Sequence, residues 1–281
     1  MKTLQLVDTH LHLWDLARFP YSWCAGIPKL NRSYRLADYH EAASGVNITK
    51  AVFMECDVDE PHLLEEARQV QKLAEADPLI AGIIASCRPE REGFRAHLDE
   101  LLQLSKLRGL RRVLHTQPDE LAQSRRFSDN LNRLPEFGLT FDLCVLARQL
   151  PVGIELVKRC PTVTFILDHC GVPDVKSGAF DPWREHVRRL AELPNVLCKL
   201  SGLVAYADPE HWTTEDLRPW VEHVVEHFGW DRMMWGGDWP VCTLAATLNQ
   251  WVESALALTA QASFGDREKL FQRNAERVYR V

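Results

Sequence analysis

Two histidines stand one residue apart at the end of an apolar segment near the start of the chain, in the sequence LVDTHLHLWD. Successive side chains of an extended strand point to opposite faces, so His10 and His12 should project from the same face. Two adjacent imidazoles can ligate a metal ion or donate hydrogen bonds to a carbonyl oxygen. The pair therefore predicts a functional site more strongly than a single histidine at a strand end, which is more often a capping or structural group.

Other polar residues end further apolar, β-leaning segments. His169 follows the buried-strand pattern TFILD, and Asp238 lies in WGGDWP, where two glycines let another group approach the backbone closely. An aspartate before proline can also simply start a turn. Glu55, His115 and Lys199 stand at comparable positions, where a structural ion pair is as reasonable as a functional role. If the strand ends converge, all these residues meet in one pocket.

The segment RGLRRVLH carries two arginines with different expected positions. Alternation places Arg111 on the same face as His115 and Arg112 on the opposite face. A barrel covers both faces of its strands, so at least one guanidinium must find a partner. Arg111 is expected either to bind a substrate oxygen in the pocket or to form an ion pair inside the barrel.

Eight apolar segments that favour strands alternate with amphipathic stretches and must position these side chains. Residues 60–78 have apolar side chains at helical spacing, prolines bracket the helix-like segments 151–161 and 182–194, and residues 266–281 form an amphipathic tail expected to pack on the outside. Strand–helix alternation indicates a parallel sheet, and eight repeats favour a closed (β/α)8 TIM barrel. The absence of GxGxxG and GxxxxGK[ST] after the first strand disfavours a nucleotide-binding fold. The predicted strands are Leu4–Asp8, Lys50–Cys56, Ile80–Ser86, Gly109–His115, Leu139–Val145, Val163–His169, Val196–Ser201 and Met233–Asp238.

Composition limits the partners of the protein. The 281 residues suit one barrel domain spanning residues 1–281, and the formal net charge of -6 disfavours nucleic acid and anionic membranes as partners. No apolar run is long enough to span a membrane, and the first residues lack the apolar core of a signal peptide. None of the eight cysteines forms a CxxC pair. We therefore expect a cytoplasmic protein with reduced thiols and a small-molecule substrate.

The motifs VDTHLHLWD, LDHCG, KLSG and MWGGDWPV, in this order, resemble the amidohydrolase superfamily. WGGDWPV is most similar to the branch of sugar-lactone hydrolases, such as L-fuconolactonases and L-rhamnonolactonases, with the dicarboxylate-pyrone lactonases nearby. The likeness extends over nearly the whole chain, to the closing NAERVY. It implies that His10 and His12 match the HxH pair of the family, that His169 matches its strand-six histidine, and that Asp238 matches its strand-eight aspartate.

The chain departs from the two-metal members of this superfamily, which carry a bridging lysine or glutamate on strand four and a histidine on strand five. Strand four here offers Arg111, Arg112 and His115, and strand five reads TFDLCV, with Asp142 and no histidine. A two-metal centre is therefore disfavoured, which leaves either no metal or one divalent cation. Zinc would be favoured by imidazole and carboxylate ligands. The candidate ligands are His10, His12, Glu55 and Asp238, with His169 as a further choice.

The resemblance implies hydrolysis of a lactone, which is a cyclic ester. We expect Asp238 to take a proton from water and return it to the leaving alkoxide, while His10, His12 and His169 polarise the carbonyl group or ligate a cation beside it. A general base contributes about 10²–10⁴-fold and one oxyanion donor about 10²–10³-fold. These effects suffice for a fairly reactive ester and fall short for an unactivated amide without a metal.

Aromatic and polar residues near the strand ends are candidates for binding the sugar. Three tryptophans can stack on the apolar faces of a ring, although core packing is an equally good explanation for each: Trp14, Trp23 and Trp239. Hydrogen bonds to hydroxyls or a carboxylate are expected from Arg111, His115 and Lys199.

Two other functions are compatible with the residues. One is a metal-dependent decarboxylase or amide hydrolase on the same scaffold, and the other is a barrel that binds a ligand without turnover. The concentration of polar strand ends favours an enzyme, because binding alone needs no base. The surface helices show no pattern that marks a dimer face.

Overall fold

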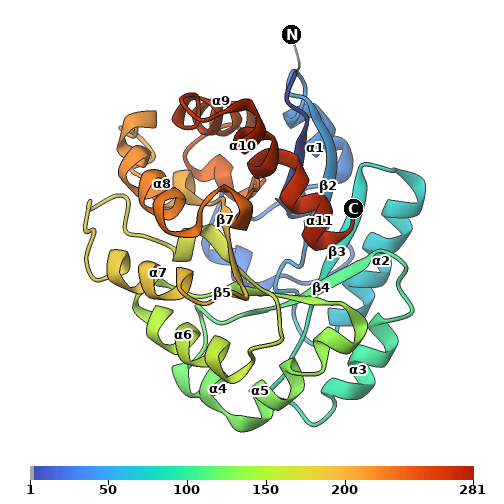
Figure 1. Ribbon diagram of the computed structural model, residues 1–281. Coiled ribbons are helices and arrows are strands. Elements are labelled where there is room, and N and C mark those ends of the chain that lie inside the picture. The colour runs from blue at the N-terminus through green and yellow to red at the C-terminus, as the bar shows by residue number, and fades with distance from the viewer. Residues whose placement is uncertain (1–2) are drawn as a thin grey trace.

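A computed structural model of the protein describes residues 3–281, so the first two residues of the expected domain lie outside the described range. Eight parallel strands form one sheet in the order β1 to β8, and helices connect them on the outside (Figure 1). The last strand approaches the first through a parallel bridge between Leu11 and Trp239, and the His12 amide donates to the Trp239 carbonyl at 2.8 Å. The protein is a (β/α)8 TIM barrel, which confirms the expected fold.

The strands lie close to their predicted positions. β3 matches its prediction, whereas β1 continues beyond Asp8, so that His10 lies within the strand. β6 and β8 end earlier than predicted because the chain leaves the extended conformation there, and His169 and Asp238 both have a φ of 54°. β6 also begins at Phe165, two residues later than predicted. The strands are β1 (Leu6–Leu11), β2 (Ile48–Met54), β3 (Ile80–Ser86), β4 (Leu107–Val113), β5 (Thr140–Cys144), β6 (Phe165–Leu167), β7 (Val196–Leu200) and β8 (Met233–Trp235).

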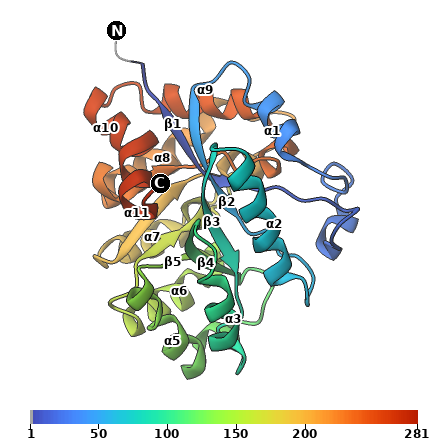
Figure 2. The same ribbon diagram turned by 90° about the vertical axis from the view of Figure 1, so that its right-hand side faces the viewer.

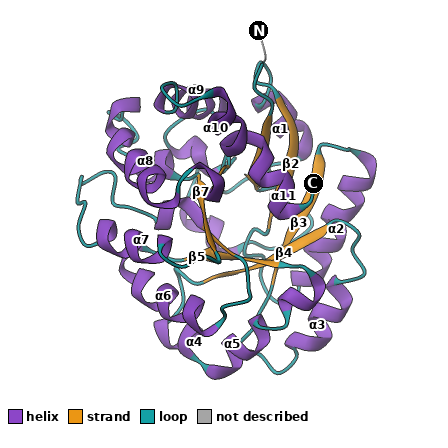
Figure 3. Cartoon of the chain, in the orientation of Figure 1, coloured by secondary structure: helices purple, strands orange, loops and turns teal. Residues whose placement is uncertain are grey.

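Helices surround the strands (Figure 3), and the three predicted segments correspond to α2, α6 and α7. In α2 the buried residues Leu63, Ala67, Val70 and Ala74 form a helical stripe. α2 packs on the outside of β3 (Figure 2). The helices are α1 (Leu36–Ala42), α2 (Leu63–Ala76), α3 (Phe94–Leu101), α4 (Asp119–Gln123), α5 (Arg125–Leu131), α6 (Leu150–Arg159), α7 (Trp183–Ala191), α8 (Thr214–Phe228), α9 (Leu248–Leu258), α10 (Phe264–Glu268) and α11 (Asn274–Tyr279).

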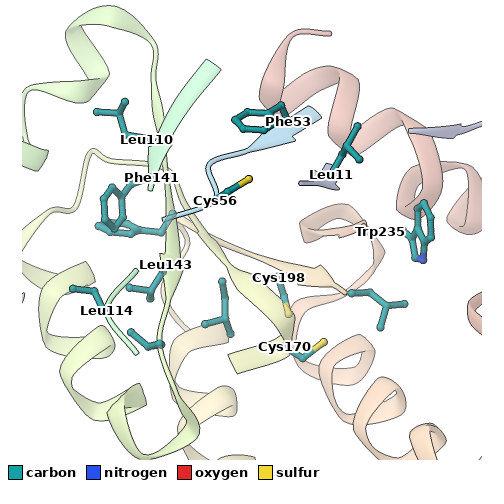
Figure 4. Close-up of a cluster of buried hydrophobic side chains, with 14 of the residues drawn as sticks. Leu11, Phe53, Cys56, Leu110, Leu114, Phe141, Leu143, Cys170, Cys198 and Trp235 are labelled. Atoms are coloured by element: carbon teal, nitrogen blue, oxygen red, sulfur yellow. The ribbon is translucent and has the colours of Figure 1, made fainter. Parts of the chain in front are cut away.

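Strand alternation divides the apolar side chains into two clusters. Phe53 packs in the large cluster between strands and helices, whereas its neighbour Met54 points into the barrel. Figure 4 shows part of the outer cluster, with Phe141 beside Leu110. The inner cluster is smaller because polar residues fill much of the barrel interior. It consists of Val52, Met54, Ile84, Ile166, Leu197, Met234 and Tyr279.

The C-terminal segment packs more deeply than its amphipathic pattern predicts. We expected residues 266–281 to lie on the outside, but Tyr279 is fully buried in the inner cluster. α11 contacts β1 and β8, and Val281 lies against Gly82 near the amino end of β3 (Figure 1). The segment therefore closes the amino end of the barrel. The difference arises because one aromatic side chain enters the barrel while the rest of the helix stays outside.

Two further features bear on the sequence expectations. All eight cysteines are buried free thiols. Within residues 3–281, no helix combines the length and the apolar character needed to cross a membrane.

Candidate active site

The carboxyl ends of β1, β6 and β8 bring together the four residues predicted to be catalytic. The imidazole centroid of His10 lies 4.8 Å from that of His12 and 4.5 Å from that of His169. Asp238 Oδ1 lies 3.8 Å from His10 Nε2 and 3.7 Å from His12 Nε2, and Asp238 Oδ2 lies 4.0 Å from His169 Nδ1. All four side chains are buried. Residues separated by up to 228 positions thus form one cluster.

Unusual backbone conformations and glycines make this cluster possible. His169 and Asp238 adopt left-handed φ values, which cost free energy in residues other than glycine and are typical of functional sites. Gly202 has a φ of 69°, and a Cβ atom there would lie 2.4 Å from His169 Nδ1. A Cβ atom at Gly236 would lie 2.7 Å from the Cβ of His10. The close approach expected at WGGDWP is therefore that of His10 to the backbone after β8.

A cavity of about 410 Å³ opens above the cluster. His12, His169 and Asp238 reach its wall, whereas His10 is fully buried beneath them. The wall combines polar groups with a broad apolar surface, as expected for a small-molecule site. Its residues are His12, Trp14, Trp23, Ile27, Leu30, Cys56, Asp57, Arg111, Val113, His115, Thr116, Cys144, His169, Ala205, Tyr206, Asp238, Val241 and Leu244.

The imidazoles in the cluster are neutral. Burial lowers the pKa of His12 and of His10 well below the ordinary value, and lowers the pKa of His169 to about 3. His12 Nδ1 lies 2.9 Å from the Met54 carbonyl oxygen, so this nitrogen carries the hydrogen and donates. His12 consequently presents the lone pair of Nε2 toward Asp238.

Asp238 has the environment of a strong carboxylate base. Burial raises its pKa well above the ordinary value, and Arg111 opposes this effect only in part. A carboxylate with a raised pKa accepts protons more readily than a solvated one, which brings it closer to the optimum for general-base catalysis near neutral pH.

A network of buried ion pairs supports the cluster from below. Lys199 Nζ lies 2.7 Å from Asp142 Oδ1 and 3.0 Å from Asp168 Oδ1, with all three side chains fully buried. Burial acts to lower the pKa of Lys199, but the two carboxylates outweigh it and raise the pKa above its ordinary value. For Asp168, burial acts to raise the pKa, yet Lys199 and the other neighbours bring it well below the usual range. The two carboxylates therefore favour the ammonium form of Lys199 inside the barrel.

His10 lies between two cations of this network. Lys199 Nζ is 3.3 Å from His10 Nδ1, and Arg111 Nη1 is 3.3 Å from His10 Nε2. A neutral imidazole has only one lone pair, so it accepts from one cation at a time. Its N–H then faces a carboxylate at the other nitrogen, which is Asp168 beside Nδ1 at 3.5 Å or Asp238 beside Nε2. The network thus controls which nitrogen of His10 carries the hydrogen.

Arg111 combines both positions expected for it. Its Nε lies 2.7 Å from Glu55 Oε1 and its Nη2 lies 2.6 Å from the Glu55 carbonyl oxygen, while its side chain also lines the cavity. Glu55 is fully buried by this pairing and does not reach the cavity. Arg112, on the opposite face, pairs with Glu90 at 3.1 Å.

The residues predicted to bind the sugar fall into two groups. Trp14, Trp23 and His115 line the cavity, and the indole of Trp23 is anchored by a hydrogen bond to the Cys56 carbonyl. Trp239 instead packs against Tyr34 and Tyr39, with ring centroids 5.3 and 5.4 Å apart. Lys199 is also outside the wall of the cavity, because it lies in the ion-pair network beneath.

Three residues of the site did not stand out in the sequence. Asp168 lies inside the quoted motif LDHCG, and strand alternation places it on the inward face with Ile166. Asp8 accepts hydrogen bonds from the Gly237 amide at 2.7 Å and the Tyr39 hydroxyl at 2.7 Å, so it ties β1 to the loop that carries Asp238. The parity of His10 would also have indicated Asp8. Tyr206, which follows β7 and lines the cavity, has no sequence signal that would have predicted its position.

The residues present fit one divalent cation. One ligand atom each from His10, His12 and Asp238 lies within 4.8 Å of the other two, and His10, Asp168 and His169 form a second such group. Metal-binding histidines usually donate their other N–H to a carbonyl or carboxylate, as His12 does to Met54. The positive charges of Lys199 and Arg111 lie against His10 and oppose a second ion. Glu55 belongs to neither group, because Arg111 occupies its carboxylate.

Comparisons with known proteins identify the family of the chain. The sequence profile of the amidohydrolase family matches residues 7–281. An L-fucono-1,5-lactonase of Burkholderia multivorans is 33% identical over 301 aligned residues, which cover 97% of this chain and 95% of that protein. An L-rhamnono-gamma-lactonase of Scheffersomyces stipitis is 23% identical, with both chains covered over 100% of their lengths. The crystal structure of an amidohydrolase from Burkholderia multivorans with bound zinc has a TM-score of 0.89 and 27% identity, and the match covers 99% of each chain.

Proposed function

Since this chain belongs to the amidohydrolase family, we propose that it opens the ring of a neutral sugar lactone by hydrolysis, with Asp238 as the general base. Its relatives named as lactonases are hydrolases of cyclic esters, and at this level the chain is an enzyme of the same kind. The observation that carries the proposal is the position of Asp238, a buried carboxylate with a raised pKa that lies within 4.0 Å of three neutral imidazoles at the wall of a cavity.

The proposed reaction begins with a water molecule beside Asp238. The carboxylate takes one proton while the water oxygen forms a bond to the lactone carbonyl carbon, which gives a tetrahedral oxyanion. As the oxyanion collapses, the bond between the carbonyl carbon and the ring oxygen breaks, and Asp238 returns the proton to the leaving alkoxide. The product is the open-chain hydroxy acid, and the side chain is ready for another cycle.

The neighbouring imidazoles divide the remaining tasks. In the proposed arrangement the Ser201 hydroxyl, 3.0 Å from His169 Nδ1, donates to this nitrogen, so that His169 Nε2 carries a hydrogen and donates to the carbonyl oxygen. His10, which lies beneath the cavity, supports the cluster from below through the carboxylate that its N–H faces. His12 presents a lone pair, and we therefore assign it to accept the second hydrogen of the attacking water or to ligate a cation. One oxyanion donor contributes about 10²–10³-fold.

A divalent cation would be held by His10, His12 and Asp238, and zinc suits this set of ligands. When bound, it would polarise the carbonyl group and lower the pKa of water. The structural requirement placed on the chain is the same in either case, because the buried His12 and Asp238 must keep their positions at the wall of the cavity.

The charges around the cavity support a neutral substrate. Among the described residues that line it, Arg111 is the one arginine or lysine, and Glu55 and Asp168 pair with it. A lactone with an added carboxylate or sulfonate would lack a free cation to bind. The apolar wall that includes Trp23, Ile27 and Leu244 suits the faces and apolar edge of a sugar ring, and His115 and Tyr206 can reach its hydroxyl groups.

A panel of lactones with a pH indicator tests the proposal, because ring opening releases an acid. We expect turnover of neutral sugar lactones at rates far above those of lactones carrying a carboxylate or sulfonate. Lactams with the same rings and an assay for carbon dioxide release test the amide hydrolase and decarboxylase alternatives in parallel. Failure to open any neutral sugar lactone would refute the proposed function.

A further inference from the structure

We propose that α8 holds a second cation site at its border with α7, formed by His223, Glu226 and His227, which binds one ion of the zinc class. One ligand atom from each residue lies within 4.8 Å of the other two. Their spacing of three and four residues places the side chains on one face of the helix. None of the three belongs to the wall of the catalytic cavity, so this site is separate from the one formed by His10, His12 and Asp238.

The ring of His223 is held in a conformation suited to a ligand. Its Nε2 lies 2.9 Å from the Arg184 carbonyl oxygen of α7, so this nitrogen carries the hydrogen and Nδ1 keeps the lone pair. A hydrogen bond from the second ring nitrogen to a carbonyl is the support that metal-binding histidines usually have. The ring also packs against Phe180 and Trp183, with centroids 5.6 and 5.2 Å away, and is 8% exposed. The ring of His223 is therefore fixed in the absence of an ion, so binding an ion removes little further conformational freedom from it.

The other two ligands lie on the solvent side. The ring centroid of His227 is 4.4 Å from that of His223, and His227 is half-buried. Glu226 is exposed, and within residues 3–281 it forms no ion pair with lysine or arginine. Glu222, four residues earlier on the same helix, differs because its Oε1 lies 3.7 Å from Arg218 Nη1. A carboxylate without a cation partner beside two imidazoles is free to contribute the third bond.

The chemistry of the donors identifies the class of ion. Two imidazole nitrogens and one carboxylate oxygen suit Zn²⁺, Ni²⁺ and Cu²⁺, whereas Mg²⁺ and Ca²⁺ prefer oxygen ligands alone. Three protein ligands leave at least one position for water, so the site is exposed and its affinity moderate. A bound ion would stiffen α8 and, through the hydrogen bond of His223 to Arg184, its contact with α7.

Zinc binding to the full chain tests the proposal. The protein is treated with a chelator, freed of it by gel filtration, and titrated with ZnCl₂ against a chromophoric chelator at pH 7.5. We expect His227→Ala to bind one zinc ion fewer per chain, or to bind the last ion at least tenfold more weakly, and Glu226→Gln to weaken that ion severalfold. Glu222→Gln is the matched control on the same helix and should bind as the parent does. Asp238→Asn should keep the ion on α8.

A second measurement separates binding from folding. Without metal, His227→Ala should melt at the temperature of the parent, and lactone hydrolysis should be unchanged. Zinc should raise the melting temperature of Asp238→Asn, and adding His227→Ala to that variant should abolish this rise, whereas Mg²⁺ should have no effect on either. The proposal is wrong if His227→Ala binds as many zinc ions as the parent with the same affinity, or if the zinc bound by the parent disappears entirely in Asp238→Asn.

Discussion

The hydroxyl of Tyr279 donates to Asp142 Oδ1 at 2.7 Å inside the barrel, and this contact connects the C-terminal helix to the catalytic cluster. The same carboxylate oxygen accepts from Lys199 Nζ at 2.7 Å, and Lys199 in turn lies 3.3 Å from His10 Nδ1. Three consecutive polar contacts therefore run from α11 to the carboxyl end of β1. Because each group is buried, removing one member leaves its partners without water to replace it.

Tyr279→Phe should lower the free energy of unfolding by about 1–2 kcal/mol, because it removes a buried hydrogen bond and retains the ring. Urea denaturation measures the change. Tyr34→Phe is the control, since its hydroxyl donates to the Lys29 carbonyl in a partly buried position. Equal stability of Tyr279→Phe and the parent would show that the contact contributes nothing.

Lys199→Met should destabilise the fold by about 3–5 kcal/mol, because it leaves the carboxylates of Asp142 and Asp168 without their shared cation. Adding Asp142→Asn removes one of these charges and should recover part of the loss. The interaction energy of the two changes, measured by denaturation of both single variants and the double variant, should exceed about 1 kcal/mol. Additive effects would contradict a coupled network.

Asp238→Asn should lower kcat by about 10²–10⁴-fold while the fold stays intact, because the amide keeps the shape of the side chain and removes its basicity. In the parent, kcat/KM for a neutral sugar lactone should rise with pH until Asp238 has lost its proton. Since burial raises the pKa of Asp238, this rise should end above the range of an ordinary aspartate. Circular dichroism verifies folding.

A second aspartate in the same cavity serves as the control for this pH profile. Burial raises the pKa of Asp57 to about 6, and Asp57 lies 3.6 Å from Arg88 rather than in the histidine cluster. Asp57→Asn should therefore keep the rise in kcat/KM that Asp238→Asn loses. A parent-like rate in Asp238→Asn would exclude the proposed base.

Glu66→Gln should change how stability depends on pH. Burial raises the pKa of Glu66 from 4.5 to about 8, so the folded chain retains a proton that the unfolded chain has already lost. The contribution of Glu66 to the free energy of unfolding is largest below pH 4.5, decreases as the pH rises toward 8, and is constant above that pH. Each unit of pKa shift corresponds to about 1.4 kcal/mol. The free energy of unfolding of Glu66→Gln, relative to that of the parent, should therefore be several kcal/mol higher at pH 8 than at pH 4.5.

Urea denaturation across this pH range tests the effect of Glu66. The exposed neighbour Glu65 provides the control, because Glu65→Gln should leave the pH dependence unchanged. Parallel curves for Glu66→Gln and the parent would show that Glu66 ionises normally in the folded chain.

The periodic parts of the fold were predictable from the sequence. β3 and the helices α2, α6 and α7 follow from apolar spacing and bounding prolines, and eight repeats were enough for the barrel. The convergence of His10, His12, His169 and Asp238 followed because parallel strands end at one face of the barrel. Their catalytic roles stay predictions.

The orientation of side chains beyond the strand ends was not predictable. Trp239 follows Asp238, whose left-handed φ ends the alternation of faces, and it packs away from the cavity. Lys199 lies on the inward face, as alternation predicts, but its depth depends on the strand register, which places it among carboxylates below the cavity. The insertion of Tyr279 depends on how α11 approaches the strands, and the helical pattern gives no information about that approach.

The filled amino end of the barrel determines the route by which substrate enters and product leaves. Tyr279 and the inner cluster fill the barrel below the ion pairs. A lactone must therefore enter, and the acid made from it must leave, through the opening of the cavity at the carboxyl end. Ring opening creates a carboxylic acid next to the restored carboxylate of Asp238. Once this acid releases its proton to the solvent, two like charges lie at close range and repel. This repulsion favours release of the product, and the next neutral lactone can enter only after the product has left the opening.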